Sequence, residues 1–209
     1  GETRRAECSM PSASPIIAQI EQAQVKKLPA FRPGDTVRVH LVNPPDASVS
    51  HSIDFHASQV SMEDEMASIA PGDLKTVFFA NCGSVANEAA LKLAERCAGP
   101  KRTTIAYASN SFHGKTRAAL SVTDSSFYQS GFTLLSNRRR VTFGDLQSLE
   151  EAFKSDPSIG TYIVETVQGG AGIVQASHEY WKGVRELCDR YGVIWLADEV
   201  QCGVGRTGR

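Results

Sequence analysis

Residues 177–198, SHEYWKGVRELCDRYGVIWLAD, carry the pattern that decides the fold. Ser177 is a typical helix N-cap, Gly192 suits a helix C-terminus, and the segment between them has one apolar helical face. That face consists of Trp181, Val184, Leu187, Cys188 and Tyr191. Residues 193–197 then form a continuous apolar run that ends at Asp198, as expected of a strand that is buried on both faces. A helix that leads directly into such a strand is typical of an α/β protein.

The same alternation of helices and strands extends upstream through the C-terminal part of the chain. Apolar residues recur at helical spacing in some segments, and continuous apolar runs lie between them. We predict helices over residues 84–97, after Gly114 and over 145–154, and strands over 103–107 and 161–165. Because strands that alternate with helices form parallel sheets, the predicted fold class is α/β, with a partial parallel sheet and flanking helices over residues 79–209.

The first 78 residues differ in character from the rest. Residues 1–14 mix charged residues with Ser, Pro and Ala, and we interpret them as a tail. Residues 15–78 are predicted to form a helix and then a small β-rich segment that prolines interrupt. The helix is expected over residues 15–27, and the strands over 36–42, 49–55 and 75–80.

Composition excludes several classes of protein. The 22 Lys and Arg residues balance 23 Asp and Glu residues, which argues against a nucleic-acid partner because such proteins carry a basic excess. No apolar run approaches the roughly 20 residues of a membrane-spanning helix, so no membrane association is expected. The five cysteines are scattered and form no CxxC pair. They favour a reducing compartment, and we predict a cytoplasmic protein without a disulfide framework or a structural zinc site.

Small and polar residues follow three of the predicted strands, at the edge where parallel sheets bind ligands. Residues 81–84, NCGS, open a helix and can offer backbone N–H groups to a phosphate, or they form an ordinary strand-to-helix turn. Residues 111–114, SFHG, can stack an aromatic ring on a flat ligand, or they belong to the core or the surface. Asp198 can hold a heteroaromatic nitrogen protonated, or it caps a helix or forms a salt bridge.

Four segments, taken in order, resemble the class III aminotransferases, which are pyridoxal-phosphate enzymes of fold type I. They are FFANCGSVANEAALKLAERCAG (78–99), SNSFHGKTRAALSVT (109–123), YIVETVQGGAGIV (162–174) and VRELCDRYGVIWLADEVQCGVGRTGR (184–209). The resemblance covers about 130 residues. It implies pyridoxal 5'-phosphate as the cofactor and amino-group transfer as the family's reaction. It also implies a homodimer, because family members build their active sites at a dimer interface.

The resemblance assigns roles to residues at one end of the cofactor and over its ring. Gly83 and Ser84 would supply the backbone amides that hold the phosphate. Phe112 would stack on one face of the pyridine ring, with His113 beside it. These positions agree with the reading of residues 81–84 and 111–114 from the strand ends alone.

The resemblance also assigns the residues around the rest of the ring. Asp198 would pair with the pyridine nitrogen and sustain the electron sink that this cofactor provides. Val200 would cover the second face of the ring, and Gln201 would reach its phenolic oxygen. Glu165 matches a family glutamate that lies near the substrate and an arginine partner.

The Schiff-base lysine of the family has no counterpart in this sequence. In the family that lysine lies on a later strand, beyond the position that matches Arg209, and none of the lysines present occupies its place. Transamination requires the lysine for covalent attachment of the cofactor and for proton transfer. We therefore expect no catalytic residue in this chain, weak noncovalent cofactor binding and no turnover of an amino donor and acceptor.

Two further resemblances lie in the N-terminal part. Residues 15–41 resemble the start of bacterial large-subunit ribosomal protein nineteen, and residues 34–78 are similar to cupredoxin domains of multicopper oxidases. The second resemblance implies copper ligands at His51 and His56, although the later cysteine and methionine ligands of those proteins are missing. The segments that resemble these families are each incomplete, and they join at shared strands. This pattern suggests a chimera, either engineered or recombined. The alternatives to a cofactor-binding fragment are thus a scaffold without catalytic function and a copper-binding module.

Overall fold

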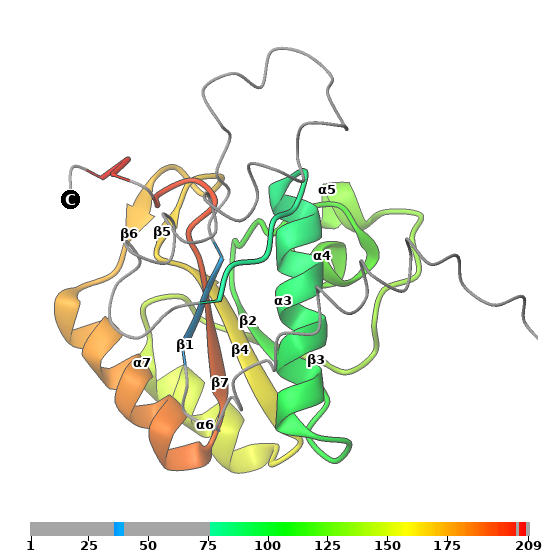
Figure 1. Ribbon diagram of the computed structural model, residues 1–209. Helices are drawn as coiled ribbons and strands as arrows, with labels where there is room; N and C mark the ends of the chain where they lie inside the picture. The colour runs from blue at the N-terminus through cyan, green and yellow to red at the C-terminus, as the bar shows by residue number, and fades with distance from the viewer. Residues whose placement is uncertain (1–35, 40–75, 204, 208–209) are drawn as a thin grey trace, which may run out of the picture. The chain divides into compact units, whose positions relative to one another are not determined.

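A five-stranded parallel sheet forms the centre of the protein in the computed structural model, which describes residues 36–39, 76–203 and 205–207. The strand order is β1-β7-β4-β2-β3, and every neighbouring pair is parallel (Figure 1). The strands are β1 (Thr36–Val39), β2 (Thr104–Ala108), β3 (Arg138–Val141), β4 (Ile159–Glu165) and β7 (Ile194–Asp198). The predicted α/β fold with a parallel sheet is therefore confirmed.

Helices cover both faces of this sheet. Helices α6 (Leu146–Ser155) and α7 (His178–Tyr191) pack against one face, where Tyr162 and Val164 of β4 are buried. Helix α3 (Gly83–Ala98) packs against the opposite face, where the intervening Ile163 is buried. Successive side chains of a strand point to opposite faces, so a strand between two helical layers must be apolar throughout. This requirement explains the continuous apolar run that the sequence shows before Asp198.

Local signals at the helix ends act as the sequence predicts. The Ser177 hydroxyl accepts a hydrogen bond from the Tyr180 N–H at the start of α7. Gly192 ends that helix with φ 63°, a left-handed conformation that glycine adopts without a steric penalty. The Asp145 carboxylate accepts bonds from the N–H groups of Gln147 and Ser148, and so begins α6.

Several elements differ from the sequence-based expectation. The strand expected over 75–80 is wrong for residues 76–80, which form no strand and leave Phe78 71% exposed. The sequence analysis missed helix α5 (Ser126–Gln129) and the antiparallel pair β5 (Val167–Gln168) and β6 (Val174–Gln175). It also missed edge strand β3, because its sequence RRRV lacks the apolar alternation of a half-buried strand.

The N-terminal part contributes β1 to the sheet. Thr36–Val39 pairs in parallel with Trp195–Asp198 of β7, which confirms part of the strand expected over 36–42. The helix expected over 15–27, the strand over 49–55 and the copper ligands His51 and His56 lie outside the described residues. No helix in the described part of the chain is long and apolar enough to cross a membrane. The same residues contain no cluster of His, Cys, Asp and Glu side chains suited to a metal ion.

Helix α4 (Arg117–Ser121) is capped by a carboxylate from α3. Its own N-cap residue, Thr116, makes no side-chain capping bond. Glu88 Oε2 accepts hydrogen bonds from Thr116 Oγ1 at 2.7 Å and from the Ala118 N–H at 3.1 Å. These bonds satisfy the free N–H groups at the start of α4 and favour a negative charge there. They also attach the loop that precedes α4 to α3.

Replacing Glu88 by alanine should therefore lower the free energy of unfolding by about 1–2 kcal/mol, the usual value of a lost helix cap. Urea unfolding followed by circular dichroism measures the change. Glu95→Ala, in the same helix at an exposed position, is the matched control and should change stability little. Equal losses in the two variants would contradict a capping role for Glu88.

Candidate active site

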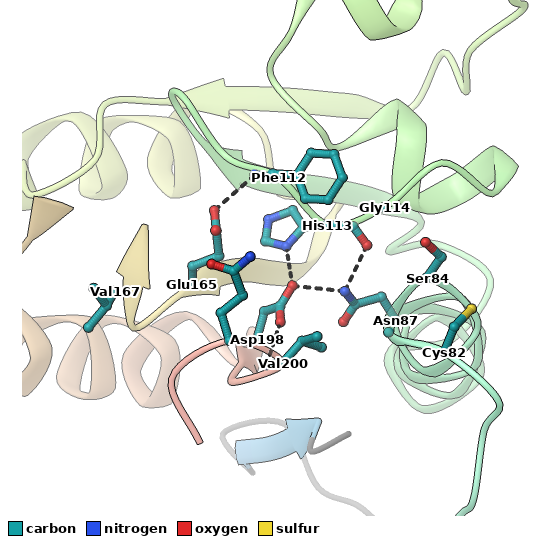
Figure 2. Close-up of a pocket in the computed structure, with 12 residues that line it drawn as sticks. Cys82, Ser84, Asn87, Phe112, His113, Gly114, Glu165, Val167, Asp198 and Val200 are labelled. Atoms are coloured by element: carbon teal, nitrogen blue, oxygen red, sulfur yellow. Dashed lines mark hydrogen bonds and ion pairs between the residues drawn. The ribbon is translucent and has the colours of Figure 1, made fainter. Parts of the chain in front are cut away.

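A pocket of about 180 Å³ opens where the carboxyl ends of β2, β4 and β7 meet the start of α3. This is the edge at which parallel α/β sheets bind their ligands. Every residue that the sequence analysis assigned to the cofactor lines this pocket (Figure 2). The lining residues are Cys82, Gly83, Ser84, Asn87, Phe112, His113, Gly114, Glu165, Val167, Asp198, Val200 and Gln201. Segments far apart in the sequence thus converge on one site.

Asp198, the last residue of β7, is the buried anion of the pocket and is 4% exposed. Its Oδ2 lies 2.7 Å from His113 Nδ1 and accepts a hydrogen bond of 2.8 Å from Asn87 Nδ2. Its Oδ1 accepts a hydrogen bond of 3.0 Å from the Val200 N–H. Buried carboxylates require such partners, because an unpaired charge away from water is costly. The arrangement therefore keeps a carboxylate at the sheet's edge.

Glu165 ends β4 directly beside Asp198, since the two residues are register partners. Its Oε2 accepts a hydrogen bond of 2.9 Å from the Phe112 N–H, which ties the 111–114 loop to β4. The pKa of the Glu165 carboxyl is raised to about 7, chiefly by burial and to a smaller extent by the nearby Asp198 charge, while His113 and backbone amides oppose the shift. This carboxyl is therefore partly protonated near neutral pH.

The N-terminus of α3 forms another wall of the pocket. Cys82 is its N-cap residue and makes no side-chain capping bond, and the first turn contains no acidic residue. The first intrahelical bond runs from the Ala86 N–H to the Cys82 carbonyl at 3.0 Å, so the N–H groups of residues 83–85 have no partner within the helix. Since α5, α6 and α7 all have side-chain caps, the uncapped end of α3 stands out as an anion-binding position.

Aromatic and aliphatic side chains complete the pocket. Phe112 and Val200 lie on different sides of Asp198 (Figure 2). Phe112 also contacts Tyr128 edge to face, with 5.6 Å between ring centroids. A methyl group on Gly83 would lie 2.7 Å from Val200 Cγ1, so only glycine permits this close approach of α3 to Val200. Gln201 lies at the exposed rim, next to Gly169.

The sequence analysis assigned no cofactor role to four lining residues: Cys82, Asn87, Gly114 and Val167. Cys82 and Gly114 lie within the candidate segments 81–84 and 111–114, whereas Asn87 and Val167 were missed. Asn87 is 1% exposed and holds both Asp198 and the His113 carbonyl. A signal for it exists in the sequence, because Asn87 lies on the same helical face as Leu91 and Ala94. A polar side chain within an apolar helical face requires a buried partner, and that partner comes from a distant strand.

The titration of Glu165 leads to a prediction about pH. Because the folded-state pKa of about 7 exceeds the ordinary value of 4.5, the folded protein binds this proton more tightly than the unfolded chain. The stabilisation is complete below pH 4.5 and is lost as the pH rises to about 7, for a total of about 3 kcal/mol. Glu165→Gln should remove this loss while it keeps an acceptor for the Phe112 N–H. Urea unfolding at pH 5 and pH 8 tests the difference, and an unchanged pH slope in the variant would contradict it.

Comparisons with known proteins agree with this geometry. The family model for class-III aminotransferases matches residues 39–209. The acetylornithine aminotransferase of Caldanaerobacter subterraneus subsp. tengcongensis is 44% identical over 138 residues, which cover 64% of this chain and 35% of that protein. The chain thus spans about a third of the length of this curated relative.

Solved structures show the same fold. The ornithine aminotransferase of Toxoplasma gondii matches with a TM-score of 0.59 and 31% identity, covering 62% of this chain and 32% of that one. A transaminase from the marine bacterium Virgibacillus matches with a TM-score of 0.69 and 28% identity, covering 93% of this chain and 43% of that one. The Toxoplasma enzyme is described with partial occupancy of pyridoxal phosphate at its active site.

This domain is an α/β domain with the aminotransferase fold. Its parallel sheet has a buried carboxylate at the end of a central strand, next to an uncapped helix N-terminus. The family model covers most of the chain, and its match begins in the N-terminal part, at Val39. The chain belongs to the class-III aminotransferase family.

The residues of the pocket fit pyridoxal phosphate, the cofactor of this family. The uncapped N–H groups at the start of α3 suit a phosphate, and the buried Asp198 carboxylate suits a protonated ring nitrogen. The glycine at position 83 leaves room where a larger side chain would meet Val200. No lysine among the described residues lines the pocket. Lys115 lies over the Tyr128 ring instead, 4.5 Å from its centroid.

Proposed function

We propose that this chain binds pyridoxal phosphate noncovalently, as the part of a class-III aminotransferase site that holds the cofactor's phosphate and ring nitrogen. One observation supports the proposal most strongly. The residues that the family resemblance assigns to the cofactor come from separate segments, and they line one pocket at the carboxyl edge of the sheet. A chance resemblance would not bring these positions together.

Each residue that the resemblance assigned to the cofactor has a physical role in this proposal. The amides of Gly83 and Ser84 bind the phosphate, because the free N–H groups of a helix start favour an anion. The Asp198 carboxylate, which His113 and Asn87 also contact, would accept a hydrogen bond from the protonated ring nitrogen and so keep that nitrogen protonated. When bound, the cofactor supplies an electron sink for chemistry at the amino-bearing carbon.

The remaining roles concern the faces of the ring and the substrate. Phe112 and Val200 cover the two faces of the ring, and Gln201 reaches its phenolic oxygen from the rim. Glu165 lies next to Asp198 and serves the substrate side of the pocket. Its partly protonated carboxyl can accept or donate a hydrogen bond near neutral pH.

The chain alone is proposed to be inactive in amino-group transfer. Covalent attachment of the cofactor and proton transfer both require a lysine in the site, and none of the described lysines lines the pocket. In a complete site, the amino donor would be an amino acid of the ornithine type, as the names of the related acetylornithine and ornithine aminotransferases suggest.

We also propose that the chain self-associates as a homodimer. Large apolar side chains are exposed in the described part, among them Phe127 at 82%, Phe132 at 66% and Ile173 at 73%. Exposed apolar groups of this size support association with a second copy. Sedimentation velocity over a range of protein concentrations tests this expectation, and a monomer at every concentration would contradict it.

Titration with pyridoxal phosphate, followed by the absorbance of the cofactor, tests the central proposal. We expect saturable binding, no lysine specifically labelled after borohydride reduction and peptide mapping, and no turnover of ornithine. A specifically labelled lysine together with turnover would contradict the proposed inactivity. The absence of saturable binding would contradict the cofactor role itself.

The same sample distinguishes the alternative functions. A chimeric scaffold without catalytic function predicts no saturable cofactor binding. A copper-binding module predicts copper affinity that is lost when His51 or His56 is replaced by alanine.

A further inference from the structure

One lining residue of the pocket, Asn87, is a buried asparagine in the middle of an apolar helical face and binds no part of the cofactor in the proposed roles. Asn87 is 1% exposed, and its neighbours on the buried face of α3 are Ala90, Leu91 and Ala94. Its Oδ1 is buried and has no hydrogen-bond partner among the residues that the structure describes. An apolar side chain of similar size would avoid this unfavourable burial, so packing alone does not account for an asparagine here.

The amide of Asn87 connects the two other segments of the site. Its Nδ2 donates to Asp198 Oδ2 at 2.8 Å and also to the His113 carbonyl at 2.8 Å (Figure 2). Asp198 ends β7, and His113 belongs to the loop after β2, so one side chain on α3 joins three separate elements. The NH2 group of a side-chain amide carries two N–H donors, and both are therefore in use.

The hydrogen bonds around Asp198 limit how the carboxylate can receive a ligand. A carboxylate has about four acceptor positions, two on each oxygen. His113 Nδ1 and Asn87 Nδ2 occupy both positions on Oδ2, and the Val200 N–H occupies one on Oδ1. One acceptor position remains, and it lies on Oδ1. Asn87 and His113 together therefore decide which carboxylate oxygen stays available to a ligand.

We propose that Asn87 is a positioning residue, which by bridging the Asp198 carboxylate and the His113 carbonyl keeps Asp198 Oδ1 available to the protonated ring nitrogen of pyridoxal phosphate. The inference rests on the proposed function, because it concerns the same ligand. Asn87 acts through Asp198 and does not itself bind the ring. An asparagine that only held elements of the fold together would act differently. Its loss would lower stability, and cofactor binding would fall only as far as the fraction of folded protein falls.

A double-mutant cycle on cofactor affinity tests the inference. The dissociation constant of pyridoxal phosphate is measured for the wild type, Asn87→Ala, Asp198→Ala and the double variant. Losing one hydrogen bond to a charged group should weaken binding about 10-fold in Asn87→Ala. In the Asp198→Ala background, the same change should have an effect below about 2-fold. Equal effects in the two backgrounds, or no effect in either, would overturn the inference.

Matched variants separate positioning from folding. Asn137 also donates from its amide to a backbone carbonyl, that of Thr103, but lies outside the pocket. Asn137→Ala should leave the dissociation constant within about 2-fold of the wild type. If Asn87→Ala fails to fold, Asn87→Leu keeps the volume and apolar character of the helix face, and it should show the same weaker binding.

A measurement without cofactor tests the positioning of Asp198 separately from the proposed function. Nitrogen-15 chemical shifts of the His113 imidazole, recorded on the cofactor-free chain, report the hydrogen bond between Nδ1 and Asp198. Asn87→Ala or Asn87→Leu should change these shifts, whereas Asn137→Ala should not. Unchanged shifts in the Asn87 variants would overturn the inference, while a wild-type chain that does not bind pyridoxal phosphate would overturn the proposed function.

Discussion

Asp198→Asn is expected to weaken pyridoxal-phosphate binding by about 10- to 100-fold, since a hydrogen bond to a charged group contributes about 1.5–3 kcal/mol. The substitution keeps the size of the side chain but removes the negative charge that favours a protonated ring nitrogen. Absorbance titration of the cofactor measures the dissociation constant. The bound spectrum should also change, because the ring nitrogen loses its anionic partner.

A second aspartate provides the control for this prediction. Asp124 accepts hydrogen bonds from the Asn110 N–H at 2.7 Å and from Arg140 Nε at 2.9 Å, and it does not line the pocket. Asp124→Asn should leave the cofactor's dissociation constant unchanged. If the two variants bind the cofactor equally well, Asp198 does not serve the ring nitrogen. Urea unfolding of both proteins shows whether a loss of folding explains the result.

Gly114→Ala is expected to lower the free energy of unfolding by about 2–6 kcal/mol and to impair cofactor binding. Gly114 has φ +125°, a conformation that side chains rarely adopt, and strain of this kind costs about 1–3 kcal/mol. An added methyl group would also lie 2.8 Å from the Ser84 Cα, and displacing this backbone costs about another 1–3 kcal/mol. Because Ser84 lines the pocket, its displacement also disturbs the anion-binding end.

Gly131 separates the two causes of this loss. It also has a positive φ, +82°, but an added methyl group would meet no atom of the described residues within 4 Å. Gly131→Ala should therefore lower the free energy of unfolding only by the amount that backbone strain costs, and cofactor affinity should remain unchanged. Thermal and urea unfolding of both variants, together with cofactor titration, measure the difference. A loss of stability in Gly114→Ala no larger than in Gly131→Ala would contradict the close contact with Ser84.

Local patterns predicted the elements of the α/β part well. Helix α7 and strand β7 follow from an N-cap, a C-terminal glycine and an apolar run, and each of these signals acts within a few residues. Edge strand β3 escaped prediction, since its pairing partner β2 is distant in sequence and its own residues are polar. Residues 76–80 gave the opposite error, because an apolar run predicts a strand only where a neighbouring strand accepts its hydrogen bonds.

The order of residue types along the chain was sufficient to predict the parallel sheet and to place residues 81–84, 111–114 and Asp198 at its ligand-binding edge, because strand ends and helix starts determine where small and polar side chains lie. The other residues assigned to the cofactor came from the resemblance to class III aminotransferases. Which of these side chains touch depended on the tertiary structure. The register of β4 against β7 places Glu165 beside Asp198, and the packing of α3 brings Asn87 to Asp198 and His113. Contacts between segments far apart in sequence depend on how whole elements pack, and no local pattern encodes that packing.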